Sequence, residues 1–141
     1  AAAREGTPLE FNSIINFCQE KETESNDLLL IEGVGGLMVP LTESRTVLDW
    51  IKALGYPVII VVGSYLGTIS HTLTTVETAQ KFGLNVASIV ISESENSPVP
   101  IHETANAIKR FLTKIPILEL PRLAPSSTPW QEAPELIIKN P

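Results

Sequence analysis

The sequence has no excess of basic residues. It carries 10 lysines and arginines against 16 aspartates and glutamates, which gives a formal net charge of −6. Proteins that bind nucleic acids replace the counterions around the phosphates with clustered basic side chains. The charge balance therefore predicts no nucleic-acid partner. A small polyanion such as ATP can still be bound, because backbone N–H groups and a divalent cation suffice for it.

Cysteine and long apolar runs are also scarce. The single cysteine, Cys18, excludes an internal disulfide and fits a reducing compartment, so we expect a cytoplasmic protein. The longest apolar run, residues 57–62, is far shorter than the roughly 20 residues that cross a bilayer. The first residues have no apolar core for a signal peptide. We therefore expect no membrane association and a single domain over residues 1–141.

The phosphate-binding pattern G-x-x-x-x-G-K-[ST] does not occur in these 141 residues. In nucleotide-binding proteins, the backbone amides of this loop surround the β- and γ-phosphates. A complete site of that kind cannot be built from this sequence alone.

A glycine-rich stretch at residues 32–36 is the most informative feature. Residues 28–31 form an unbroken apolar run, typical of a strand covered on both faces, and Glu32 follows at its end. Ligands bind at the carboxyl ends of parallel strands, and glycines leave room for phosphate near the backbone. The stretch thus predicts a nucleotide–metal site. The alternative is a tight turn with a solvated Glu32.

Helical and strand patterns alternate along the chain. Residues Thr7-Pro8-Leu9-Glu10 predict a helix start, with threonine as the N-cap and proline at the first helical position. Helical spacing and apolar runs predict the remaining elements. In chain order, we expect a helix from residue 7 to about 20, then strands at 28–31, 57–62, 86–91 and 117–120, separated by helices at 46–54, 68–82 and 101–112.

This alternation predicts an α/β fold, a parallel sheet with helices on both faces. In such a sheet all strand ends point to one edge. We therefore expect Glu32, Gly63, Ser92 and the turn at residues 120–121 to be neighbours.

Three patterns then occur in order. EGxGGxxxPL begins at Glu32, DWxxxLxxPVIxVVG at Asp49, and LGxIxHxLxT at Leu66, with ELPRL at residues 119–123. Over residues 5–123, the sequence resembles the C-terminal part of dethiobiotin synthetase. The resemblance implies a three-layer sandwich of the P-loop NTPase type, here without the strand that carries the phosphate loop. We expect that loop and the catalytic lysine on a segment that precedes Ala1.

The resemblance also implies an activity. The family consists of ATP- and Mg²⁺-dependent ligases of biotin biosynthesis that act as homodimers. In their reaction, 7,8-diaminononanoate takes up CO2 as a carbamate, ATP phosphorylates the carbamate, and the second amine closes the ureido ring of dethiobiotin. We expect the complete protein to catalyse this reaction and the present chain alone to be inactive. The alternatives are a binding or regulatory domain without catalysis, and a related amidoligase with another substrate.

The family pattern implies roles for residues at the glycine-rich stretch. Glu32 matches the Mg²⁺ ligand, and we expect it to be catalytic. Gly33, Val34 and Gly35 match the loop that lies along the nucleotide. A hard carboxylate beside polyphosphate suits Mg²⁺, which keeps most of its waters.

The base of the nucleotide is expected at two other loops. Ser92 and Glu93 stand where the family usually has an Asn-Asp pair, whose asparagine can pair with the adenine edge; a hydroxyl makes fewer of those bonds. Pro121, Arg122 and Leu123 match the loop that closes over the adenine. Arg122 could stack on the base.

The loop after the strand at 57–62 matches the region that binds the substrate carboxylate across the dimer interface. Its residues are Tyr65, Leu66, Gly67, Thr68 and Ser70. Backbone amides that open a helix near Thr68 are suitable partners for an anion. Tyr65 replaces a common lysine and Ser70 a common asparagine, so the set of donors is altered.

Overall fold

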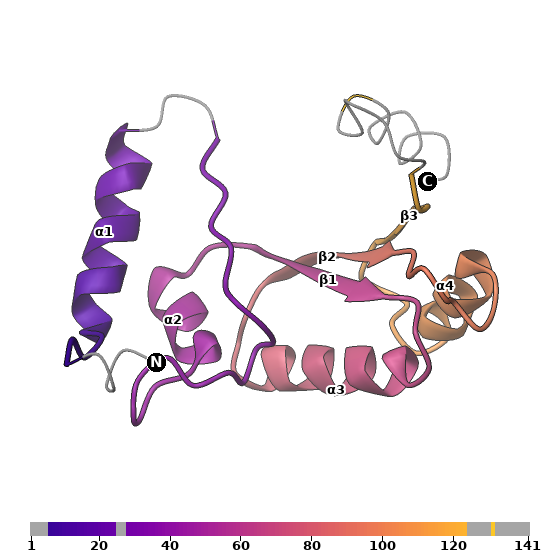
Figure 1. Cartoon of the computed structure of the whole chain (residues 1–141), viewed down its shortest axis with the longest axis horizontal. Helices are drawn as coiled ribbons and strands as arrows, with labels where there is room; N and C mark the ends of the chain where they lie inside the picture. The colour runs from indigo at the N-terminus through magenta and orange to yellow at the C-terminus, as the bar shows by residue number, and fades with distance from the viewer. Residues whose placement is uncertain (1–5, 25–27, 124–130, 132–141) are drawn as a thin grey trace. The chain divides into compact units, whose positions relative to one another are not determined.

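The structure is a computed structural model that describes residues 6–24, 28–123 and 131. The described residues belong to two compact units (Figure 1). The helical unit comprises residues up to 56 together with 82–84, and the sheet unit comprises residues 57–81 and those from 85 onward. Each unit is described by itself. That the whole chain forms one domain stays a prediction.

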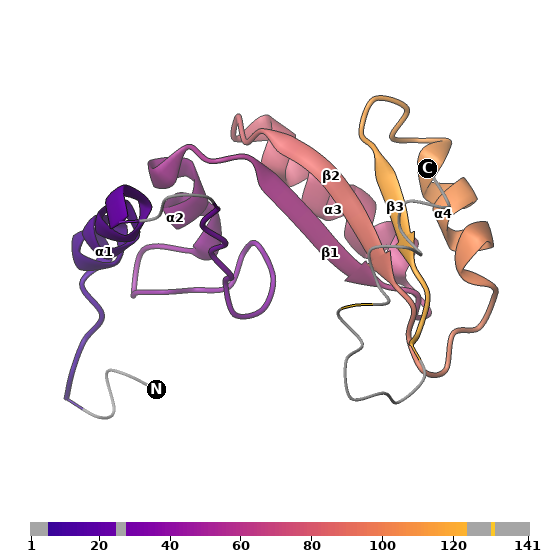
Figure 2. The same cartoon turned by 90° about the horizontal axis from the view of Figure 1, so that it is seen from above.

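The sheet unit is built on three parallel strands, β1 (Val58–Gly63), β2 (Val86–Ser92) and β3 (Ile117–Leu120), in the order β1-β2-β3. Val62 pairs with Ile91, and Ile91 pairs with Glu119 on its other side. Figure 2 shows the strands side by side. Three of the four predicted strands and their parallel pairing are confirmed, and with them the α/β fold with an open parallel sheet.

Two helices cover one face of this sheet. Helix α3 (Thr68–Lys81) connects β1 to β2, and α4 (Ile101–Lys109) connects β2 to β3. Both contribute to one core with residues from all three strands. The buried members of this core are Ile60, Val76, Ile89, Ile91, Ala105, Ile108 and Ile117.

The opposite face of the sheet carries exposed apolar side chains. Ile59 and Val61 of β1 alternate with the buried Ile60 and are 55% and 66% exposed. Alternation along a strand places them on the face away from α3 and α4. Within the described residues of the sheet unit, the second helical layer of the expected sandwich is not seen.

The helical unit contains α1 (Phe11–Glu24) and α2 (Val47–Leu54). Helix α2 ends where predicted and begins one residue later than predicted, because Thr46 is its N-cap; Gly55, with φ of +73°, ends it. Helix α1 begins later than predicted. The Glu10 carbonyl oxygen accepts the N–H groups of Ser13 and Ile14, so the first turn forms after Glu10 and not at Thr7. Buried Cys18, Val47 and Trp50 form the core between the two helices.

The prediction of a strand at residues 28–31 was wrong. These residues form no strand, and Leu28 and Leu30 are 74% and 77% exposed. A strand needs a neighbouring backbone to complete its hydrogen bonds. Among the described residues, none pairs with this segment. Glu32 therefore follows an extended segment and does not stand at the end of a strand.

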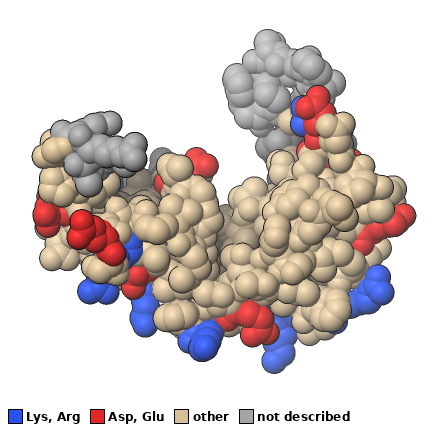
Figure 3. All heavy atoms as spheres, turned by 60° about the horizontal axis from the view of Figure 1, so that its bottom comes forward, with Lys and Arg blue, Asp and Glu red and all other residues tan. Residues whose placement is uncertain are grey.

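The surface of each unit carries mixed charge. On the face that Figure 3 presents, Lys and Arg side chains lie among acidic and uncharged ones. In the part of the chain that the structure describes, no helix has both the length and the apolar character needed to cross a bilayer.

Candidate functional site

The carboxyl ends of the three strands meet at one edge of the sheet unit. The loops that follow them cover residues 64–67, 93–100 and 121–123. The parallel pairing places Gly63 beside Ser92 and Ser92 beside Leu120. The predicted meeting of these three loops is thus confirmed.

Three serines tie the loops after β1 and β2 together. The Ser64 N–H donates to Ser94 Oγ at 3.0 Å, and the Ser94 N–H donates to Ser64 Oγ at 2.9 Å. The Ser97 hydroxyl lies 2.9 Å from the Ser64 carbonyl oxygen and 2.6 Å from that of Val99, and it can donate its single hydrogen to either. Ser64 is only 1% exposed. We call Ser64, Ser94 and Ser97 the serine clasp, and it fixes the two loops relative to one another.

Gly63 makes this close approach possible. A Cβ atom at this position would lie 2.8 Å from Ser94 Oγ and 2.9 Å from Tyr65 Cδ1. Side chains do not approach each other so closely, so the loop requires a glycine here. The motif VVG at the end of the strand therefore has a steric basis.

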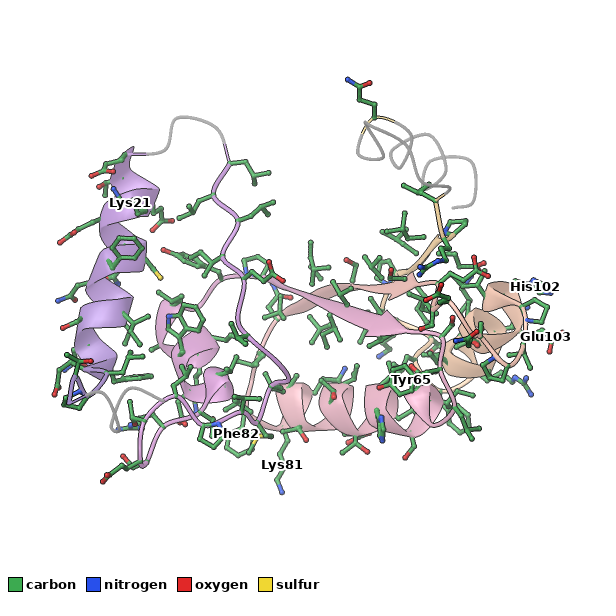
Figure 4. The ribbon with its side chains drawn as sticks, in the orientation of Figure 1. Lys21, Tyr65, Lys81, Phe82, His102 and Glu103 are labelled. Atoms are coloured by element: carbon green, nitrogen blue, oxygen red, sulfur yellow. The ribbon has the colours of Figure 1, made fainter. Side chains whose placement is uncertain are left out.

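The predicted substrate residues lie at the start of α3. The Tyr65 hydroxyl is 3.0 Å from His71 Nδ1, and Figure 4 shows Tyr65 over the first turn of this helix. Thr68 is buried, and its hydroxyl donates to the Gly63 carbonyl oxygen at 2.6 Å. Leu66, Gly67 and Ser70 are exposed. Thr68 thus supports the loop, while its neighbours face solvent.

The first turn of α3 offers two free backbone donors. The Thr68 N–H donates to the Tyr65 carbonyl oxygen and the His71 N–H to that of Gly67. Among the described residues, the N–H groups of Ile69 and Ser70 have no hydrogen-bond partner. Unpaired amides at the start of a long helix are suited to bind an anion.

The loops after β2 and β3 also meet. The Glu93 N–H donates to the Leu120 carbonyl oxygen at 2.9 Å, and Glu93 Oε2 accepts the Arg122 N–H at 2.9 Å. Arg122 Nη2 lies 3.7 Å from Glu95 Oε2. The structure therefore brings Ser92, Glu93 and residues 121–123 together, as predicted.

A pocket of about 410 Å³ opens beside this junction. Its lining is mostly polar or proline and includes two carboxylates and the Arg122 guanidinium. The lining residues are Glu93, Ser94, Glu95, Ser97, Pro98, Val99, Pro100 and Arg122.

The glycine-rich stretch lies in the helical unit and packs on α2. The Val47 N–H donates to the Val39 carbonyl oxygen at 2.9 Å, and the Leu48 N–H to that of Leu37 at 2.8 Å. A Cβ at Gly33 would lie 3.3 Å from Val47 Cγ1. Gly35 has φ of +80°, a conformation that favours glycine. The stretch is thus shaped by its contacts with the start of α2.

Glu32 and Val34 point outward from this stretch, as both are exposed. The described residues contain no group of three or more His, Cys, Asp or Glu side chains suited to hold a metal. Mg²⁺ is commonly bound by one or two carboxylates with waters and substrate phosphates. An accessible Glu32 fits that donor set. Its proximity to the loops of the sheet unit stays a prediction.

The serine clasp is the part of this site that the sequence did not reveal. Serines beside two predicted strand ends were the only signal, since the reciprocal bonds depend on how the strands pair. His102 and Glu103, at the start of α4, point away from the sheet in Figure 4.

The chain matches the family model described as AAA domain over residues 1–129. It is 47% identical over 116 residues to the ATP-dependent dethiobiotin synthetase BioD of Acidiphilium cryptum, covering 82% of this chain and 52% of that protein. The same-named proteins of Methylobacterium nodulans and a Caulobacter species are each 45% identical, covering 78% and 86% of this chain and 50% and 53% of theirs. The chain thus spans about half the length of these relatives. It belongs to the AAA domain family, and its predicted resemblance to dethiobiotin synthetase is confirmed.

Proposed function

We propose that the full-length protein containing this chain is an ATP- and Mg²⁺-dependent dethiobiotin synthetase. It would form the ureido ring of dethiobiotin from 7,8-diaminononanoate and CO2. The observation that carries the proposal is the 47% identity to a protein of that name over 82% of this chain. Because the chain spans about half of such relatives, the activity is assigned to the whole protein and not to these residues alone.

The role proposed for Glu32 is to hold Mg²⁺. Its carboxylate is exposed and follows an extended segment, so it is accessible to a hydrated cation. When bound, the metal supplies positive charge for the phosphate oxygens during phosphoryl transfer. The neighbouring Gly33, Val34 and Gly35 would lie along the nucleotide, where the positive φ of Gly35 shapes the backbone.

The role proposed for the start of α3 is to bind the carboxylate of 7,8-diaminononanoate. The unpaired N–H groups of Ile69 and Ser70 are the donors, and the dipole of this 14-residue helix favours an anion there. Tyr65, Leu66 and Gly67 would line the approach. Holding the far end of the substrate fixes its amines for carbamate formation and ring closure.

The role proposed for the pocket beside the loops after β2 and β3 is to bind the adenine base of ATP. Arg122 is 55% exposed on its side chain and can stack on the ring, and Ser92, Glu93, Pro121 and Leu123 form the surrounding loops. We also propose that the protein is cytoplasmic and forms a homodimer. The exposed Leu66 supports the dimer, because the substrate loop is expected at that interface.

The test is a product assay with the full-length protein. It is incubated with ATP, Mg²⁺, bicarbonate and 7,8-diaminononanoate, and dethiobiotin and ADP are measured by mass spectrometry. We expect both products in equal amounts, no product without the diamine, and none from residues 1–141 alone. Nucleotide binding without turnover would favour a binding domain, and ATP consumption with a different amine only would favour a related amidoligase. Either result contradicts the proposal.

A further inference from the structure

Glu93 occupies a position where the pairing of β2 with β3 ends. The last pair of this ladder is Ser92 with Leu120. Glu93 extends it by one bond, because its N–H donates to the Leu120 carbonyl oxygen at 2.9 Å. In this parallel register alternate residues of the other strand donate, so the next donor is the Arg122 N–H, which a regular ladder would join to the Glu93 carbonyl oxygen.

The regular ladder stops here, and the next acceptor is the side chain of Glu93. Its Oε2 atom accepts the Arg122 N–H at 2.9 Å, so a carboxylate replaces the backbone acceptor that a regular ladder would offer. Hydrogen bonds with an ionised acceptor are stronger than those between neutral groups. The two bonds of Glu93, one from its backbone and one from its side chain, hold residues 120–122 against β2.

The ion pair of Arg122 contributes less to this arrangement. Arg122 Nη2 and Glu95 Oε2 are 3.7 Å apart, and the two side chains are 55% and 75% exposed. Exposed pairs of this kind contribute little to stability. The backbone bond to Glu93 is therefore the contact that fixes the turn.

From this geometry we propose that Glu93 is a positioning residue for the turn at Pro121–Leu123, and that it does not itself read the base. This inference rests on the proposed function, in which that turn lies against the nucleotide. Its carboxylate keeps the Arg122 backbone, and with it the guanidinium, beside the pocket. The proposal thus changes the role expected for Glu93 from a base contact to a support of the neighbouring loop.

The test compares three variants of the full-length protein. Glu93→Ala removes the acceptor, Glu93→Gln keeps a neutral carbonyl acceptor, and Glu77→Gln is the control that removes one negative charge from an exposed position of α3, outside the pocket. Hydrogen exchange at the Arg122 amide reports whether its bond to Glu93 is formed. Steady-state kinetics give KM for ATP and kcat. Thermal unfolding verifies that each variant is folded.

Loss of a partly exposed bond to a charged acceptor corresponds to about a threefold to tenfold change in an equilibrium constant. We therefore expect Glu93→Ala to speed Arg122 exchange and raise KM for ATP by about that factor, with kcat changed by less than about twofold. Glu93→Gln should lie between Glu93→Ala and the wild type. Glu77→Gln should match the wild type.

Three results would overturn the proposal. The first is unchanged Arg122 exchange in Glu93→Ala. The second is equal losses in Glu93→Gln and Glu93→Ala, which indicate a role of the charge. The third is a loss in Glu77→Gln as large as in Glu93→Ala. If the wild type makes no dethiobiotin, the proposed function fails, while the exchange measurement still decides whether Glu93 holds the turn.

Discussion

At the scale of single residues, the edge of the sheet depends on Gly63. We predict that Gly63→Ala destabilises the chain by about 1–3 kcal/mol, because overpacking forces neighbouring atoms to move. The added Cβ would meet Ser94 Oγ at 2.8 Å and Tyr65 at 2.9 Å. Urea unfolding measures the change. Gly36→Ala is the control, since no atom lies within 4 Å of its Cβ; equal effects of the two substitutions would refute the steric argument.

A second residue-scale prediction concerns Asp49 at the start of α2. The Thr46 N–H and hydroxyl donate to Asp49 Oδ2 at 2.8 Å and 2.9 Å, and these bonds lower the pKa of that carboxyl from its ordinary value of 3.8. The charged form is thus favoured in the folded chain. Its stabilising contribution is complete above pH 3.8 and is lost as the pH falls through the lower folded pKa.

We therefore predict that Asp49→Asn lowers Tm at neutral pH, and that the difference from the wild type shrinks below pH 3.8. Thermal unfolding of both proteins from pH 7 to about pH 2.5 measures this difference. A difference that does not change with pH would show that the charge of Asp49 has no part in the cap.

At the scale of elements, local signals predicted some parts well. The limits of helix α2 lie within one residue of the prediction, because Thr46 and Gly55 determine its ends through short-range hydrogen bonds and backbone conformation. The apolar run at residues 28–31 gave an equally strong pattern but forms no strand. A strand depends on a partner that its own sequence does not specify. The serine clasp was missed for the same reason, since it joins loops 30 residues apart.

The packing of α3 and α4 on the sheet gives an element-scale prediction. Ile89 of β2 is fully buried in the core of the sheet unit, whereas Ile59 of β1 is 55% exposed on the other face. We expect Ile89→Ala to lower the free energy of unfolding of this chain by about 2–5 kcal/mol. Ile59→Ala should lower it by less than about 1 kcal/mol. Urea unfolding compares the two, and similar losses would contradict the described core.

At the scale of the whole molecule, the exposed loop before α3 predicts an interface. Leu66 is 89% exposed, and we expect a second copy to cover it in the proposed homodimer. Leu66→Glu in the full-length protein should raise the dimer dissociation constant at least about tenfold, because a charge is costly to bury. Phe111→Glu, at a residue 68% exposed after α4, is the control. Sedimentation velocity measures both; a monomeric wild type would contradict the dimer.

At this scale, part of the candidate site could be predicted from the sequence. The topology of parallel strands predicted that the loops after β1, β2 and β3 meet, and they do. The roles of Glu93 and Thr68 could not be predicted from motif positions. Their side chains hold neighbouring backbone groups, a function that depends on distances between loops. Glu32 lies in the other unit, so its part in the site stays a prediction.

The central claim is that Glu32 holds the Mg²⁺ of an ATP-dependent synthetase. The most direct test is the rate of dethiobiotin formation by the full-length protein, its Glu32→Ala variant and a Glu43→Ala control, which also removes an exposed carboxylate of the helical unit. We predict that Glu32→Ala lowers turnover at least about a hundredfold, because a catalytic metal contributes several kcal/mol. Glu43→Ala should turn over like the wild type. Unchanged turnover in Glu32→Ala, or no dethiobiotin from the wild type, would contradict the account.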